Sequence, residues 1–299
     1  MTSGVLPAGG RRPVAAASFA PSARWAQPGA AEDLARRAAQ RATLFVFDLD
    51  GTALGGYEPY DRIPGPFARF LDSLAARGAA WATNSTWSPL AQAAMIERSG
   101  VGSTPAFLFG RTGLMRSRGL ASGRVVYDAD WARSFVPMEA AWISEFLPAL
   151  RRLCAQFPGA SLALVEGEPL LCSILANGAD WPSLLASVRS LVARHAEASA
   201  AIDAGVKRVR FQPAVMNKAT ALRAMQKDLA APPQRTLVAG DGGNDLPMLD
   251  PGLAAFLVCP DNAAPEVRAR VLNAGGRAGA ACFSDGVLDA VAELFASRP

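Results

Sequence analysis

Two aspartates, Asp48 and Asp50, follow directly on the apolar run 43–47 in the segment TLFVFDLDGT. A spacing of two residues at the end of an extended strand lets both carboxylates project to the same side. Two carboxylates about 4 Å apart near a protein surface repel each other by about 4 kcal/mol unless a cation lies between them or one is protonated. The pair therefore predicts a metal site, or two carboxyl groups that carry different charges.

Two other interpretations apply to the same segment. Asp-Gly is a common turn pair, so an ordinary turn at the end of a strand is one alternative. The pattern D-x-D-G-T also begins like a calcium-binding loop. With Asp48 as the first position of such a loop, Ala53 stands where the loop needs glycine and Pro59 where it needs glutamate. The calcium loop is thus excluded, and the turn remains as the alternative for this segment taken alone.

Further polar groups follow other apolar or helical segments. Thr83 ends the apolar run AAWAT, Asp241 follows RTLVAG in the glycine-rich stretch AGDGGNDLPML, and Lys218 opens the helical pattern KATAL. In open α/β sheets, ligands bind beyond the carboxyl ends of the strands. Asp241, which like Asp48 follows a strand, is therefore expected at the same edge of the sheet. Each one alone also fits an ordinary strand threonine, a solvated lysine or a helix cap.

The segments that carry these residues alternate between apolar strands and helical patterns. Strands are expected over 43–47, 79–83 and 235–240, a helix over 64–77, and a second helix with Ser88 as its N-cap. This alternation is typical of a parallel sheet covered by helices on both faces. The fold class predicted is α/β, with a Rossmann-like doubly wound parallel sheet as its core.

The middle of the chain shows a different pattern. Hairpins are expected over 161–175 and 199–212, separated by a helix over 182–196, which indicates an antiparallel α+β unit. We interpret this unit as a cap domain inserted into the core. The expected division is a core domain of residues 42–87 and 214–299 and a cap domain of residues 88–213.

The first 41 residues are expected to be an N-terminal extension. Residues 1–30 are rich in Ala, Gly, Pro and Ser without periodicity, which predicts disorder, and 31–41 fit a short helix. Arg11-Arg12 suggests an export signal as an alternative, but the apolar stretch that follows is short and broken by proline.

Composition excludes several classes of protein. Of the 299 residues, 51% are hydrophobic and 19% charged, and no apolar stretch approaches the roughly 18 residues that a membrane span needs. The formal charge of +4 resides in residues 1–41, so no basic face for nucleic acid is expected. Four widely spaced cysteines and a single histidine argue against zinc sites and disulfides, and favour the cytoplasm.

DLDGT, Thr83, Lys218 and GDGGND, in this order, resemble the signature of the haloacid dehalogenase (HAD) superfamily of phosphohydrolases. GDGGND and the large mid-chain insert resemble its Cof-type (class IIB) branch, and the resemblance extends over about 43–297. One motif departs from that branch, because Thr83-Asn84-Ser85 replaces its usual Thr-Gly-Arg. That motif is more similar to the branch of nucleotide and sugar-phosphate phosphatases with Thr-Asn-Asn.

The resemblance implies a phosphatase that requires magnesium and forms an aspartyl-phosphate. Asp48 would be the nucleophile, and Asp50 the general acid that protonates the leaving oxygen and then the base that activates water. The residues implied for the phosphoryl group are Thr83, Asn84, Lys218 and Asn244. Those implied for Mg²⁺ are Asp48, Asp50 through its backbone carbonyl, Asp241 and Asp245.

The expected substrate is a small phosphorylated metabolite, such as a sugar phosphate, and the expected assembly is a monomer or homodimer. In VKRVRFQ, strand alternation places Arg208 and Arg210 on the face opposite Val209 and Phe211. The family's cap sheet implies that the arginines lie above the site, where they would grip a second anionic group; a solvated basic face is the alternative. Two other functions stay open: a phosphomutase of this fold, and a non-catalytic phosphate or magnesium sensor.

Overall fold

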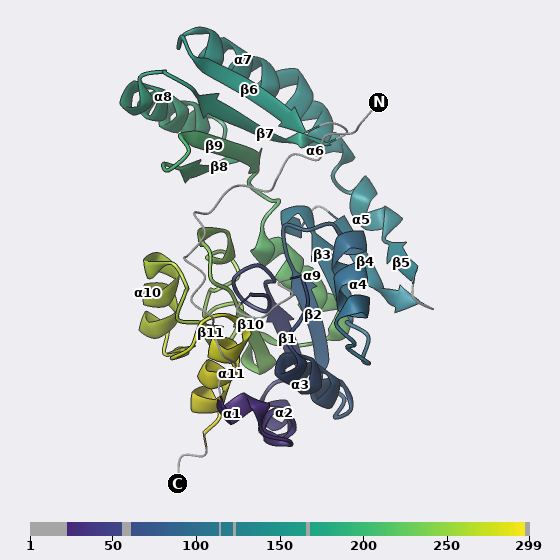
Figure 1. Cartoon of the computed structure of the whole chain (residues 1–299). Coiled ribbons are helices and arrows are strands. Elements are labelled where there is room, and N and C mark those ends of the chain that lie inside the picture. Colours follow the sequence, from purple (N-terminus) through teal and green to yellow (C-terminus); the bar gives the residue numbers. More distant parts are fainter. Residues whose placement is uncertain (1–22, 56–60, 114, 122–123, 166–167, 297–299) are drawn as a thin grey trace.

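The computed structural model describes residues 23–55, 61–113, 115–121, 124–165 and 168–296. Its largest element is an eight-stranded sheet in the order β12-β11-β10-β1-β2-β3-β4-β5 (Figure 1). The strands are β1 (Leu44–Phe47), β2 (Ala80–Asn84), β3 (Phe107–Gly110), β4 (Met115–Ala121), β5 (Arg124–Tyr127), β10 (Thr236–Ala239), β11 (Phe256–Cys259) and β12 (Arg277–Ala278). Pairing is parallel from β12 to β3 and antiparallel beyond it.

The register of the sheet brings three strand ends to one level. Phe47, the last residue of β1, lies opposite Thr83 of β2 on one side and Ala239 of β10 on the other. All four residues of β1 are buried, as expected for a central parallel strand covered on both faces. The residues that follow β1 and β10 are therefore delivered to the same edge of the sheet.

Helices cover both faces of this sheet, which confirms the predicted α/β fold class. On one face lie α2 (Ala30–Arg41), α3 (Gly65–Ala75), α4 (Pro89–Arg98) and α11 (Phe283–Leu294). On the other lie α9 (Lys218–Leu229) and α10 (Pro265–Asn273). The expected helix starts are present: the Ser88 hydroxyl accepts from Ala91 N, and Asn217 Oδ1 accepts from Thr220 N.

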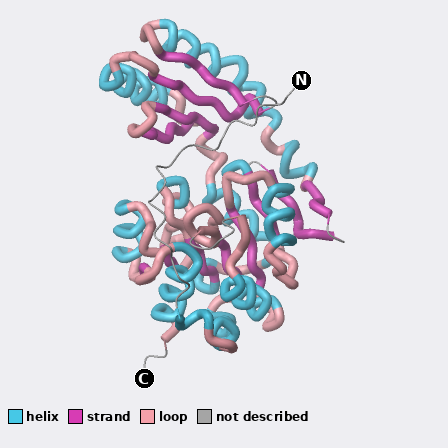
Figure 2. The backbone as a smooth tube through the Cα atoms, viewed as in Figure 1, coloured by secondary structure: helices cyan, strands magenta, loops and turns pink. Residues whose placement is uncertain are grey.

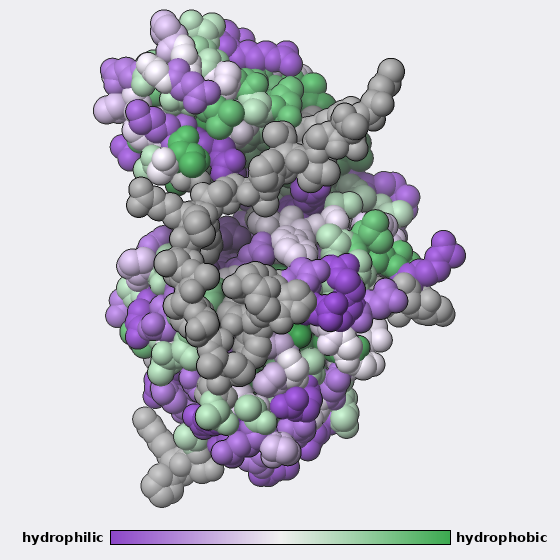
Figure 3. Space-filling model, viewed as in Figure 1, coloured by the Kyte–Doolittle hydropathy of each residue, from purple (hydrophilic) through white to green (hydrophobic). Residues whose placement is uncertain are grey.

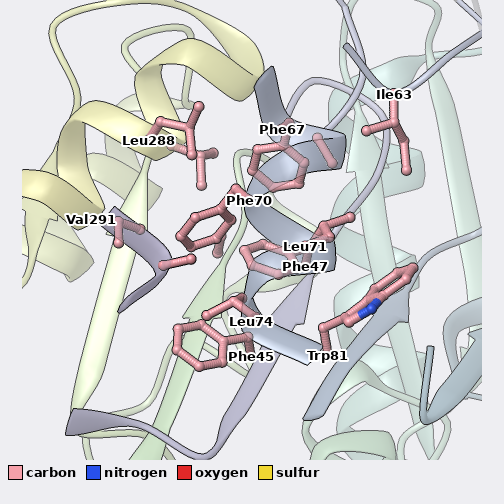
Figure 4. Packing of buried hydrophobic residues seen from close by; sticks show 14 of the residues in the cluster. Phe45, Phe47, Ile63, Phe67, Phe70, Leu71, Leu74, Trp81, Leu288 and Val291 are labelled. Carbon is pink, nitrogen blue, oxygen red and sulfur yellow. The ribbon is translucent and has the colours of Figure 1, made fainter. Parts of the chain in front are cut away.

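Aromatic side chains fill the core between β1 and α3 (Figure 4). The rings of Phe47 and Phe67 pack edge to face with centroids 5.1 Å apart, and those of Phe45 and Phe70 do so at 6.3 Å. Trp81 of β2 is also buried there. This packing fixes the strand that precedes Asp48 against its covering helix.

The cap is a second, antiparallel sheet with its own hydrophobic core. Its strands, in the order β6-β7-β9-β8, are β6 (Ala160–Val165), β7 (Glu168–Ala176), β8 (Ala198–Asp203) and β9 (Arg208–Pro213). Two helices, α7 (Leu147–Ala155) and α8 (Trp181–Arg194), bury their apolar sides against it. Both predicted hairpins and the helix between them are thereby confirmed.

The start of the cap differs from the boundary expected at residue 88. The segment 88–127 forms α4, β3, β4 and β5, and these three strands continue the core sheet. Arg116 of β4 is buried and forms an ion pair with Asp228 of α9, which ties this hairpin to the core. The boundary at residue 88 is therefore wrong: it was inferred from the hairpins over 161–175 and 199–212, and no strands were expected between residues 88 and 127.

Short helices connect the two sheets. They are α5 (Ala129–Arg133), α6 (Val136–Ala141) and a π-helical turn, Trp142–Phe146, that leads into α7. Trp131 of α5 packs against the clusters of both sheets. In Figures 1 and 2 the cap stands over the edge of the core sheet at which β1, β2 and β10 end.

The N-terminal segment from residue 23 onward belongs to the core. The expected helix over 31–41 is α2, but the disorder expected through residue 30 is wrong for 23–30, which form α1 (Ala23–Ala26) and the turn after it. Trp25 is only 1% exposed and its indole donates to Asp289 at 3.0 Å. One large aromatic thus anchors a segment whose composition suggests disorder; residues 1–22 lie outside the described residues.

Within the described residues, no helix combines the length and the apolar character that crossing a bilayer requires. All four cysteines are free thiols, with Cys172 and Cys259 buried.

Candidate active site

A buried ion chain lies at the ends of β1 and β10. Asp48 directly follows β1, Lys218 opens α9, and Asp245 ends the short 3₁₀ turn η4 (Gly243–Asp245). The Lys218 ammonium donates to Asp48 Oδ1 at 2.6 Å and to Asp245 Oδ1. Lys218 and Asp245 are fully buried and Asp48 is 5% exposed. The resemblance implied that these three residues share one site, and the fold brings their side chains together.

Asp245 is held on both of its carboxylate oxygens. Its Oδ1 faces Lys218, and its Oδ2 accepts backbone N–H groups of Asp241 at 2.9 Å and Gly242 at 2.8 Å. The GDGGND loop is therefore closed on itself by its own aspartate. This arrangement fixes the backbone from which Asp241 projects.

Three carboxylates come together in this loop region. Oxygens of Asp48, Asp241 and Asp245 all lie within 4.8 Å of one another. Thr52 Oγ1 donates to Asp241 Oδ1 at 3.1 Å. At Gly51, φ is +81° and an added Cβ would lie 2.3 Å from Asp241 Oδ2, so glycine is required for the DLDGT turn to approach Asp241.

The electrostatics of the cluster call for a cation. Burial, reinforced by the charge of Asp245, raises the pKa of the Asp48 carboxyl well above its ordinary value, although Lys218 opposes the shift. Burial would lower the pKa of Lys218, but the carboxylates of Asp245 and Asp48 outweigh it and raise that pKa above its ordinary value. With all three carboxylates ionised, the cluster and the Lys218 ammonium would carry two negative charges, which a divalent cation would balance.

Asp50 has an environment different from that of Asp48. Its side chain is exposed and does not join the carboxylate cluster. Instead, its Oδ2 accepts the indole N–H of Trp87 at 2.7 Å. The two aspartates of DLD thus differ in burial and in partners, as two carboxyl groups with separate tasks require.

Thr83 lies at the end of β2, buried, with its hydroxyl bonded to Gln92 Oε1. The Gln92 NH₂ donates to two backbone carbonyls, those of Trp87 and Phe109, both at 2.8 Å. Because carbonyls accept only, they fix the orientation of the amide and make Thr83 the donor to Gln92. In this arrangement the hydroxyl proton of Thr83 is directed at Gln92, which differs from the expected donation to a phosphoryl oxygen.

The two asparagines implied for phosphate differ in position. Asn84 is fully buried and its amide donates to the Lys218 carbonyl at 2.9 Å, so its side chain holds the start of α9. Asn244 is exposed on η4, beside the cluster in sequence. The structure thus gives Asn84 a partner that the motif alone did not indicate.

The cap arginines lie on β9 with the alternation that the sequence predicts. Val209 and Phe211 are buried in the cap core, Arg210 is exposed and Arg208 half-buried. The residues that flank Arg210 in register are Ser173 of β7 and Ala201 of β8. The link 214–217 joins this strand directly to Lys218.

Several residues of the site were not anticipated from the sequence. Trp87 and Gln92 are the partners of Asp50 and Thr83, and Thr52 is the partner of Asp241. Asn262, in the segment CPDNAAPEV, donates to the Gly51 carbonyl at 2.8 Å. Thr52 belongs to the DLDGT motif, whereas the roles of Trp87, Gln92 and Asn262 depend on contacts between distant parts of the chain.

Comparisons with known proteins agree with this geometry. Residues 169–276 match the sequence model of the haloacid dehalogenase-like hydrolase family, a range that contains Lys218, Asp241 and Asp245 but not Asp48. No curated protein sequence matches the chain significantly.

Solved structures extend the likeness to most of the chain. Sucrose-phosphatase from Synechocystis sp. PCC6803, in complex with sucrose and phosphate, is 21% identical with a TM-score of 0.62, covering 85% of this chain and 98% of that chain. The haloacid dehalogenase-like hydrolase protein yhjK from Bacillus subtilis is 15% identical with a TM-score of 0.57, covering 86% and 93%. Trehalose-6-phosphate phosphatase from Aspergillus fumigatus is 18% identical with a TM-score of 0.54, covering 77% and 86%. The matched segment and the shared fold agree with the resemblance that the motifs carry: residues 169–276 match the haloacid dehalogenase-like hydrolase family, and the chain shares the fold of these three structures.

Proposed function

We propose that this chain is a magnesium-dependent phosphatase that hydrolyses a small phosphorylated metabolite through an aspartyl-phosphate on Asp48. The observation that carries the proposal is the buried chain of Asp48, Lys218 and Asp245 beside Asp241. Asp48 would act as the nucleophile, and the Lys218 ammonium would bind the phosphoryl oxygens. The excess of carboxylates over ammonium groups would favour binding of a metal cation at the same place.

The residues present fit a magnesium ion. Mg²⁺ prefers oxygen ligands and in phosphoryl-transfer sites is bound by one or two carboxylates. Asp48, Asp241 and the backbone carbonyl of Asp50 would hold it, whereas both oxygens of Asp245 already have partners, so Asp245 would orient Asp241 and Lys218. When bound, the ion supplies positive charge to the phosphoryl oxygens and neutralises the carboxylates.

The remaining chemistry belongs to side chains of the chain itself. Asp48 attacks phosphorus while the bond from phosphorus to the leaving oxygen breaks, and Asp50 gives its proton to that oxygen. Asp50 then takes a proton from water, which attacks the aspartyl-phosphate and releases inorganic phosphate. Lys218 stabilises the negative charge of the phosphoryl group as it moves.

We propose that the cap determines the substrate specificity. A sugar phosphate is favoured because the fold is shared with sucrose-phosphatase and trehalose-6-phosphate phosphatase. Arg210 is exposed on the face of β9 opposite Val209 and Phe211, and we propose that its guanidinium binds a second anionic group of the substrate. Arg208 would assist it from the same face. We also propose that the protein works in the cytoplasm, as a monomer or homodimer, which suits its four free thiols.

A metal titration with p-nitrophenyl phosphate tests the proposal. EDTA should abolish hydrolysis and Mg²⁺ should restore it, and Mg²⁺ should raise the melting temperature of the parent but not of Asp241→Asn, because ligand binding to the native state stabilises it. Turnover that survives EDTA would contradict the metal assignment.

The same assay separates the alternatives. A protein that is stabilised by Mg²⁺ and phosphate but turns over no ester of a metabolite panel would be the sensor. Activity that requires a bisphosphate activator and returns the phosphoryl group to the sugar would identify a phosphomutase.

A further inference from the structure

Trp87 contacts the residue assigned to acid and base catalysis. Its indole Nε1 donates to Asp50 Oδ2 at 2.7 Å, across a separation of 37 residues in the chain. The ring is half-buried and packs against the core cluster that contains β1 and α3. The bond therefore joins the loop after β2 to the DLDGT turn after β1.

The chemistry of the indole makes this contact directional. An indole N–H donates a hydrogen bond and cannot accept one, so Asp50 Oδ2 must be an acceptor in this contact. A protonated Asp50 that keeps the bond therefore carries its proton on Oδ1. The indole thus distinguishes the two oxygens of Asp50 without exchanging a proton itself.

The loop that presents Trp87 is fixed by its own buried hydrogen bonds. Gln92, fully buried in α4, donates to the Trp87 carbonyl at 2.8 Å, and the Trp87 amide donates to the Ser85 hydroxyl at 3.2 Å. An added Cβ at Gly110 would lie 2.4 Å from the Trp87 carbonyl oxygen. The close approach of β3 and the Gln92 amide thus hold this backbone in place, so the indole is oriented before any ligand arrives.

We propose that Trp87 is a positioning residue that holds Asp50 by Oδ2 and leaves Oδ1 to give a proton to the leaving group and to take one from water. The inference rests on the proposed function, because it assigns a role within that reaction. The loop that carries Trp87 is the one in which the sequence departs from Thr-Gly-Arg. Its TNSTWSP sequence thus provides a contact that the motif alone does not specify.

The test removes the N–H and retains a ring. Trp87→Phe should lower kcat for an alkyl phosphate about tenfold or more, since a hydrogen bond to a charged group is lost, with KM changed less than kcat. With p-nitrophenyl phosphate, whose leaving group needs no proton, the p-nitrophenol burst should keep its rate while the steady-state rate falls.

Trp81→Phe is the matched control, because it deletes one buried indole bond, to Ser103 Oγ at 3.0 Å, away from the aspartates. Equal effects of the two substitutions at equal melting temperature, or a burst slowed as much as the steady state, would overturn the role of Trp87. A parent enzyme that hydrolyses no phosphoester would instead overturn the proposed function, and the inference with it.

Two further measurements exclude a packing effect. Replacing Trp87 by 3-benzothienylalanine keeps the shape of the ring and exchanges N–H for sulfur, and should reproduce the loss even if Trp87→Phe folds poorly. In the Asp50→Asn background, Trp87→Phe should have little further effect on steady-state turnover, because its target is already gone. A full additional loss there would show that Trp87 acts through another group.

Discussion

The two sheets carry cations in opposite settings. Lys218, at the edge of the core sheet, is fully buried between the carboxylates of Asp48 and Asp245, whereas Arg210 of the cap sheet is exposed with Ser173 and Ala201 beside it. A buried charge depends on its partners, so changing one member disturbs all. An exposed charge can change at small cost. We therefore expect a substitution at Lys218 to disturb the fold more than one at Arg210.

The largest effect is expected at Asp48, the proposed nucleophile. Asp48→Asn should lower kcat/KM by at least about 10³-fold, because an amide neither attacks phosphorus nor binds a cation well. The control is Asp61→Asn, whose carboxylate forms a surface pair with Arg98 and is half-exposed. If Asp48→Asn keeps near-parental turnover in steady-state kinetics, Asp48 is not the nucleophile.

The contrast between the two cations can be measured as stability. Lys218→Met should destabilise the fold by about 3–5 kcal/mol, because it leaves Asp48 and Asp245 buried without their cation. Arg210→Met should stay within about 0.5 kcal/mol of the parent. Urea unfolding in the presence of EDTA, so that no metal replaces the ammonium, provides the comparison. Equal losses of unfolding free energy in both variants would mean that the fold depends on Arg210 as much as on Lys218.

A substrate-dependent effect is expected on the cap. Arg210→Ala should lower kcat/KM about 10 to 150-fold for a substrate with a second anionic group, which corresponds to the loss of one charge-assisted hydrogen bond of about 1.5 to 3 kcal/mol. Hydrolysis of p-nitrophenyl phosphate, which has no such group, should barely change. Arg189→Ala, an exposed arginine on α8, is the control. If Arg210→Ala affects both esters alike, the arginine acts on cap structure instead of on the substrate.

The core could be predicted from the sequence because its signals are local. An apolar run that ends in Asp48, a glycine-rich turn after β10 and a capped helix that starts at Lys218 each follow from neighbouring residues. The parallel register then brings them together, since Phe47 lies level with Ala239 and Thr83. Local patterns thus sufficed once the fold class was known.

Contacts between segments that are distant in the sequence could not be predicted from local patterns. Nothing around Gln92 in the sequence indicates that it accepts from Thr83 and supports the Trp87 backbone, because both contacts need α4 to pack on β2 and β3. The predicted cap, 88–213, includes residues 107–127 because no strands were expected there, yet these residues form strands that pair with the core sheet. Sheet membership is decided by pairing partners, which periodicity does not reveal.

The smallest effect is expected for the chain before α1. Residues 1–22 are rich in Ala, Gly and Pro without periodicity, so their deletion should leave kcat/KM and the melting temperature nearly unchanged. Deleting residues 1–29 should instead destabilise the core, because it also removes α1 and Trp25, and loss of a buried Trp side chain costs about 3–5 kcal/mol. Thermal unfolding of the two truncated proteins side by side checks the difference. A large loss of kcat/KM in the shorter deletion would mean that residues 1–22 contribute to the site. The activity would then depend on a third segment besides the core and the cap.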